Sequence, residues 1–145
     1  MNILPYIRKV QFYETDQMGV VHHANYVRWF EEARVDLMEQ IGYGYDRAAA
    51  ADVHFAVIGV QCDYKSMARF GETVRIATEI PSFSATRMTI SYKIADENGG
   101  TLRVAGETRH CFYNTTLRTP VSLKKALPDL FDIFQALARR DSPAA

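Results

Sequence analysis

The period of the hydrophobic pattern changes once along this chain, and that change limits the folds that it can adopt. After a turn at Gly19, apolar side chains recur at steps of three and four, the spacing of one face of an α-helix of about five turns. From residue 54 onward the period is two, which indicates strands with one buried face. The helical positions are Tyr26, Phe30, Ala33, Leu37 and Ile41. One long helix followed by a run of strands is therefore predicted.

The predicted strands have short connections. A first strand is expected over residues 6–13, and four more over 54–64, 73–80, 86–96 and 101–114. Asn98-Gly99-Gly100 predicts a tight hairpin, so consecutive strands should be largely antiparallel. Gly59 and Gly106 interrupt strand patterns and indicate bulges or strong curvature.

Residue types also suggest where the helices end. Asn25 is the best N-cap by type, and Gly42 is a suitable left-handed C-terminal stop. Residues 46–51 could add a short helical turn. A second amphipathic helix is predicted from about Pro128, with residues 141–145 as a frayed tail.

These elements predict a single α+β domain over residues 1–145. A five- or six-stranded antiparallel sheet must wrap around one long central helix to bury its apolar stripe. Such a sheet leaves two exposed edges, so we expect a homo-oligomer.

Charge excludes some partners. The chain has 17 Lys plus Arg and 17 Asp plus Glu, a formal net charge of +0, so no field attracts nucleic acid.

No apolar run approaches the roughly 20 residues that span a bilayer, and Arg8 and Lys9 lie where a secretory signal would be apolar, so we expect a cytoplasmic protein. His22 and His23 are adjacent and show no metal-ligand spacing, so neither a metal nor a cofactor is expected.

The densest group of polar and glycine residues lies between the first strand and the long helix, over residues 13–26. A helix N-terminus carries unpaired N–H groups and the positive end of the helix dipole, which together can bind a developing oxyanion. Asp16, on the preceding loop, can supply a nucleophilic carboxylate or a general base, a combination that suits acyl transfer. The alternative interpretation is that Asp16 only caps a turn and that both histidines are surface residues.

This segment also resembles a known family. It reads Thr15-Asp16-x-x-Gly19-Val20-Val21-x-His23-x-Asn25-Tyr26, followed by Trp29-Phe30-Glu31-Glu32-Ala33-Arg34. The motif is similar to that of hotdog-fold acyl-CoA thioesterases of the 4-hydroxybenzoyl-CoA thioesterase type, including the Tol-Pal-associated branch. The resemblance extends more loosely to about residue 120. It implies the hotdog fold, with dimers that often form tetramers, and hydrolysis of an acyl-CoA without a cofactor.

The resemblance also implies roles for individual residues. Asp16 matches the catalytic carboxylate, acting as nucleophile or through an activated water. The backbone N–H of His23 matches the group that polarises the thioester carbonyl, and its side chain matches a histidine that is important in the Tol-Pal-associated branch. Gly19, Val20 and Asn25 are expected to contact substrate, although Asn25 also suits a structural cap.

The chain departs from the family pattern at two positions. Lys9 replaces the usual Gln or Arg, and His22 replaces a common aromatic residue, which predicts a more polar pocket wall. A second hotdog branch uses a helix glutamate, but we interpret Glu31 and Glu32 as structural, and Glu31 could pair with Arg34 three residues on.

Cations after the helix are candidates for the phosphates of coenzyme A. Lys65, Arg69 and Arg87 flank or occupy predicted strand ends, and solvated surface charge is the alternative. Tyr64 and Phe83 could line the acyl tunnel, although core packing suits them better. Two other functions stay open: a non-catalytic module that binds acyl-CoA or acyl carrier protein, and a hotdog hydratase or dehydratase.

Overall fold

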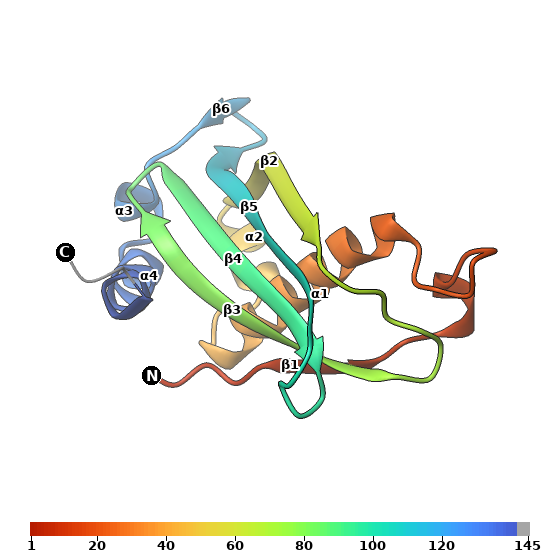
Figure 1. Cartoon of the computed structure of the whole chain (residues 1–145). Coiled ribbons are helices and arrows are strands. Elements are labelled where there is room, and N and C mark those ends of the chain that lie inside the picture. Colours follow the sequence, from red (N-terminus) through yellow and green to blue (C-terminus); the bar gives the residue numbers. More distant parts are fainter. Residues whose placement is uncertain (142–145) are drawn as a thin grey trace.

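The structure, a computed structural model, describes residues 1–141 as a curled antiparallel sheet around one long helix (Figure 1). The strand order is β1-β3-β4-β5-β2, and β6 pairs with β5. The strands are β1 (Tyr6–Lys9), β2 (His54–Tyr64), β3 (Thr73–Phe83), β4 (Arg87–Asp96), β5 (Leu102–Asn114) and β6 (Thr119–Pro120). All pairs are antiparallel, so the predicted α+β arrangement is confirmed.

The central helix is α1 (His23–Gln40), and its predicted apolar stripe is buried against the sheet. The short α2 (Tyr45–Ala50) follows, close to the predicted turn at 46–51. The other helices, α3 (Leu123–Ala126) and α4 (Pro128–Asp141), pack together beside β3 (Figure 1). The sequence predicted α4 and missed α3 and β6, which have too few residues to show a period.

The N-cap of α1 differs from the prediction. His22, not Asn25, is the cap: its backbone is extended, and its Nδ1 accepts a hydrogen bond from the Ala24 N–H at 3.1 Å. Asn25 lies inside the first turn, buried, where its Nδ2 donates to the Glu14 carbonyl at 2.8 Å. Gly42 has φ +75°, which confirms the predicted C-terminal stop.

Two strands have different limits from those predicted. β1 ends at Lys9 because residues 12–14 form a 3₁₀ turn. β3 passes through Pro81, with a register shift between Glu79 and Ser82 that accommodates the missing N–H. At this irregularity the Ile80 N–H donates to Asp141 of α4 at 3.0 Å. Asp141 is therefore helical rather than part of a tail, and residues 142–145 lie outside the described residues.

The two strand glycines have different roles. Gly59 lies at a register shift between β2 and β5, as predicted. Gly106 lies in regular pairing, but a Cβ there would be 2.7 Å from the Phe30 ring and 2.5 Å from the Gln61 carbonyl oxygen. A glycine at this position therefore lets α1 approach the sheet closely.

Four polar side chains form a row of hydrogen bonds between α1 and the sheet. Arg34 Nη1 donates to the Tyr92 hydroxyl at 3.2 Å, and the Tyr92 and Thr108 hydroxyls are 2.7 Å apart. The Thr108 hydroxyl is 2.7 Å from His110 Nε2. Burial and then the charge of Arg34 lower the pKa of His110 to about 4, so its imidazole is neutral at pH 7.

We expect His110 to make the fold sensitive to mild acid. The ordinary pKa of histidine is 6.5, so between pH 6.5 and about 4 the unfolded chain binds a proton that the folded chain does not. The free energy of unfolding therefore decreases as the pH decreases through this range, by about 3 kcal/mol over the whole range. Urea titrations at pH 7 and pH 5 should show a smaller loss for His110→Leu than for the wild-type chain. An equal loss would contradict this assignment.

Candidate active site

A compact loop presents Asp16 beside the start of α1. The Asp16 N–H donates to the Val20 carbonyl, and the Gly19 N–H donates back to the Asp16 carbonyl, each at 2.9 Å. Gly19 has φ +77°, which suits glycine at this tight turn. Short β-bridges join Thr15 to Val21 and Val20 to Arg69. The loop is thus fixed by backbone contacts at both ends.

The carboxylate of Asp16 is half-buried and only partly engaged. Its Oδ1 accepts from the Met18 N–H at 2.8 Å, so the turn-capping role considered from the sequence is real. Among residues 1–141 no protein partner is found for Oδ2. One oxygen orients the side chain, and the other is available to a substrate or a water molecule.

The first turn of α1 leaves one donor free. The His22 N–H bonds to the Glu14 carbonyl, the Ala24 N–H to His22 Nδ1 and the Asn25 N–H to the His22 carbonyl. Within the described part of the chain, no acceptor meets the His23 N–H. This N–H lies at the positive end of the helix dipole, where it can donate to a polarised carbonyl oxygen.

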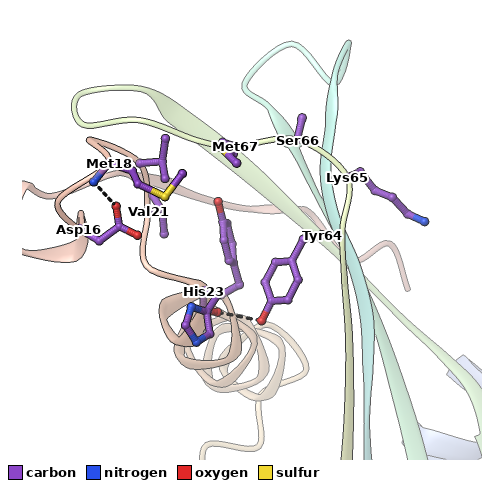
Figure 2. Close-up of a pocket in the computed structure, with 10 residues that line it drawn as sticks. Asp16, Met18, Val21, His23, Tyr64, Lys65, Ser66 and Met67 are labelled. Carbon is purple, nitrogen blue, oxygen red and sulfur yellow. Dashed lines mark hydrogen bonds between the residues drawn. The ribbon is translucent and has the colours of Figure 1, made fainter.

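A cavity of about 280 Å³ brings these groups together (Figure 2). Asp16 lies on one side, Tyr64 on the other, and His23 lies at the end of α1 between them. Apolar side chains form much of the wall, and Lys65 and Ser66 lie toward β2. These apolar residues are Met18, Val20, Val21, Tyr26 and Met67.

Tyr64 belongs to this cavity, so the prediction of core packing for it was wrong. Its side chain is 51% exposed, and its hydroxyl donates to the His23 carbonyl at 3.1 Å. Local burial and the neighbouring Cys62 raise the pKa of Tyr64 to about 12, so the phenol is a neutral donor at pH 7. Phe83, in contrast, packs against aromatic rings of β5 and α4, as predicted.

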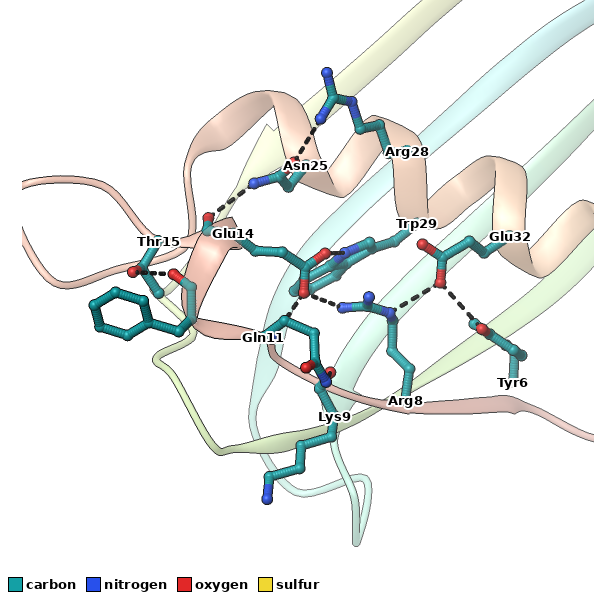
Figure 3. Close-up of polar contacts among 11 residues, drawn as sticks. Tyr6, Arg8, Lys9, Gln11, Glu14, Thr15, Asn25, Arg28, Trp29 and Glu32 are labelled. Carbon is teal, nitrogen blue, oxygen red and sulfur yellow. Dashed lines mark hydrogen bonds and ion pairs between the residues drawn. The ribbon is translucent and has the colours of Figure 1, made fainter.

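A buried carboxylate, Glu14, fixes the loop and the helix in place (Figure 3). It accepts from Arg8 Nη1 at 2.7 Å, the Gln11 N–H at 2.9 Å and Trp29 Nε1 at 2.7 Å. Burial opposes its charge, but these three donors outweigh burial and lower the pKa of Glu14. Sequence reasoning did not identify this residue, because its partners are spread over 22 positions.

The two departures from the family pattern do not reach the cavity. Lys9 is exposed, because successive side chains of β1 alternate and Arg8 faces inward (Figure 3). His22 is exposed and stacks on His23 with ring centroids 4.1 Å apart, but it does not line the cavity. The predicted polar wall at His22 was therefore wrong.

The structure separates the other predicted site residues. Lys65 lines the cavity, and Arg69 is exposed beside Val20 on the adjoining segment. Arg87 pairs with Cys111 at the opposite end of the sheet from Tyr64, which pairs with Val104.

The helix glutamates lie away from this cavity. Glu32 accepts from Arg8 at 2.9 Å and from Tyr6 at 3.0 Å, as a structural residue would. Glu31 lines a different hollow and does not pair with Arg34.

Within residues 1–141, no three His, Cys, Asp or Glu residues are placed to hold a metal ion. None of the helices over these residues is long and apolar enough to cross a membrane.

Comparisons with known proteins point to one family. The family model described as Thioesterase-like superfamily matches residues 10–131. The putative acyl-CoA thioesterase YneP of Bacillus subtilis (strain 168) is 31% identical over 121 residues, 83% of this chain and 87% of the relative. The acyl-CoA thioester hydrolase YbgC of Escherichia coli O157:H7 is 30% identical over 97 residues, 67% and 72% of the two chains. A DHNA-CoA thioesterase structure from Staphylococcus aureus has a TM-score of 0.87 at 27% identity, covering 97% of this chain and 96% of that one.

Proposed function

We propose that this chain, which belongs to the thioesterase-like superfamily, hydrolyses acyl-CoA thioesters at the cavity between Asp16 and the start of α1. The family and the hotdog fold predicted from the sequence are confirmed by these matches. The observation that carries the proposal is the free His23 N–H beside a carboxylate oxygen without a protein partner, in one partly apolar cavity.

The proposed chemistry uses these two groups in sequence. The His23 N–H donates to the thioester carbonyl oxygen and stabilises the negative charge that develops there. Asp16 then attacks the carbonyl carbon to give a mixed anhydride, which water hydrolyses, or it removes a proton from an attacking water. By either route the C–S bond breaks, the thiolate of coenzyme A leaves and is protonated, and the acid is released.

The remaining cavity groups position this arrangement. Tyr64 holds the His23 carbonyl, so it supports the first turn of α1 rather than the substrate carbonyl. His23 lines the cavity at the start of α1, where its imidazole can orient a water molecule.

A hydrolysis screen tests the proposed function. Purified protein is incubated with short, long and aromatic acyl-CoAs, and release of free thiol is followed. We expect thiol release with at least one ester, and acid and coenzyme A in equal amounts. Tight binding without thiol release would favour the non-catalytic module, and addition of water to an enoyl-CoA would favour the hydratase.

We expect Lys65 and Arg69 to bind the phosphates of coenzyme A. These phosphates lie far from the reacting carbonyl and interact equally with the ground and transition states, so Lys65→Ala and Arg69→Ala should raise KM and leave kcat unchanged. A loss of about 1 kcal/mol, or about fivefold in KM, suits an exposed ion pair, and added salt should reduce the difference.

Arg87→Ala is the matched control for these variants, because Arg87 lies at the other end of the sheet. Its KM for acyl-CoA should equal that of the wild-type chain. Unchanged KM values for Lys65→Ala and Arg69→Ala would place the phosphates elsewhere.

We also propose that the chain forms at least a dimer through β2. This edge strand leaves its outer backbone groups without a neighbouring strand, and Val57, Ile58 and Val60 are each 45–46% exposed. Light scattering at micromolar concentration should give at least twice the monomer mass. Ile58→Lys should shift the population toward monomer, whereas a wild-type monomer would contradict the proposal.

A further inference from the structure

A second hollow lies between α1, β2 and β5. Its volume is about 230 Å³, and Arg34 and Thr108 form its inner wall. Val27, Val57 and Val60 provide apolar sides. Because Val27 is one helical turn after His23, and Val60 precedes Tyr64 on β2, this hollow lies beside the Asp16 cavity, further along α1 and β2.

Arg34 carries a buried charge without a counterion. It is 8% exposed, its Nη1 donates to the neutral Tyr92 hydroxyl, the neutral Tyr45 side chain also lies beside it, and its Nε has no partner. Over residues 1–141 no carboxylate lies within 4.0 Å of the guanidinium. A buried cation is costly unless it is paired, so an anion that reaches the hollow would stabilise this guanidinium.

The groups around Arg34 do not neutralise it. Tyr92, Thr108 and His110 continue the row of hydrogen bonds, and His110 is a neutral imidazole whose Nδ1 is also without a partner. Glu31 and Arg28 line the hollow as exposed residues, and their opposite charges balance. The net charge that the hollow presents is therefore the single positive charge of Arg34.

The guanidinium group selects the chemistry of the ligand. Its N–H groups match the two oxygens of a carboxylate, and methylene groups suit the valine walls that lead to it. Arg34 lies eleven positions after His23, a rise of about 16.5 Å along the helix, and the arginine side chain shortens this distance because side chains lean toward the N-terminus. A medium-length acyl chain can span the shortened distance between the start of α1 and the Arg34 guanidinium.

We propose that Arg34 binds a carboxylate at the far end of the acyl group, so that the substrates are CoA monothioesters of dicarboxylic acids. This proposal rests on the proposed function, because it places the thioester of the same molecule at Asp16 and His23. A monocarboxylic acyl chain of equal length would leave Arg34 buried and unpaired.

Matched substrates test this proposal without a variant. Adipyl-, suberyl- and sebacyl-CoA are compared with hexanoyl-, octanoyl- and decanoyl-CoA for kcat/KM in the wild-type chain. We expect a preference of about tenfold or more for the dicarboxylic ester at the best length, as one added charge-assisted contact would give. An equal or lower kcat/KM for the dicarboxylic ester at every length would overturn the proposal.

Two substitutions assign the preference to Arg34. Arg34→Met should remove it, and Arg34→Lys, which keeps the charge, should retain part of it. Arg139→Met is the matched control, because it removes an exposed cation from α4, outside the hollow, and should leave the preference intact. If Arg34→Met does not fold, the Arg34→Lys and Arg139→Met variants still decide: equal preferences in the wild-type, Arg34→Lys and Arg139→Met chains would overturn the role of Arg34.

A binding measurement separates this proposal from the proposed function. Free suberate should raise the melting temperature of the wild-type chain, whereas octanoate at the same concentration should not. No hydrolysis of any ester, together with stabilisation by suberate, would overturn the thioesterase and support the anion site. Hydrolysis of monocarboxylic esters without any effect of suberate would support the thioesterase and overturn the anion site.

Discussion

Asp16→Asn should lower kcat for acyl-CoA hydrolysis by about 100-fold or more. The substitution removes the negative charge, and with it the nucleophile or general base, but keeps nearly the same shape. The amide oxygen can still accept from the Met18 N–H, so the loop and the melting temperature should be preserved. KM should change little, because the phosphates and the apolar wall are untouched.

Asp63→Asn is the matched control for this variant. Asp63 is an exposed carboxylate on β2, one residue before Tyr64, and it does not line the cavity. Its kcat should equal that of the wild-type chain. Near wild-type hydrolysis by Asp16→Asn would instead contradict the assignment and direct attention to Glu31 and Glu32.

Glu14→Gln should destabilise the fold by about 3 kcal/mol. The substitution leaves the Arg8 guanidinium, 11% exposed, with Glu32 as its remaining anion, and it places an amide group among donors from Arg8, Gln11 and Trp29. Because the Glu14 carbonyl also holds His22 and Asn25, the start of α1 should loosen, and kcat should fall as well.

Glu32→Gln provides the comparison, because it removes the other anion of Arg8 from a site that is 37% exposed. Such a pair contributes about 1 kcal/mol or less, so the melting temperature should change little.

The lowered pKa of Glu14 adds a pH test. Its stabilisation is complete above the ordinary pKa of glutamate, 4.5, and is lost as the pH falls through the lower pKa of the folded state. The stability difference between the wild-type chain and Glu14→Gln should therefore shrink in acid, and a constant difference would contradict the account.

The sequence predicted the elements whose side chains repeat with a regular period. The stripe of α1 and the alternation of β4 were sufficient to place both, because burial of one face determines which residues are apolar. Their ends depend on individual hydrogen bonds instead. An imidazole cap at His22 is rarer than an asparagine cap, and the extension of β3 past Pro81 depends on Asp141, 61 residues after Ile80.

The same distinction applies to the candidate site. The loop motif placed Asp16 beside His23 because both lie in one short segment that leads into the helix. Tyr64 was considered for the tunnel but assigned to the core, and Glu14 was not identified, because their contacts join residues 41 and 15 positions apart and no periodicity records such pairs. The missing counterion of Arg34 is likewise visible only in three dimensions, since its sequence neighbour Glu31 suggested an ion pair.

The carbonyl stretch of a bound thioester most directly tests the claim that the start of α1 acts on the substrate. Asp16→Asn, which should turn over slowly, is mixed with an acyl-CoA carrying a ¹³C label at the thioester carbonyl, and the infrared difference spectrum is recorded. A hydrogen bond from the His23 N–H should lower the carbonyl frequency relative to the free ester, because it weakens the C=O bond. A frequency unchanged on binding would show that the carbonyl is not polarised there and would contradict the proposed site.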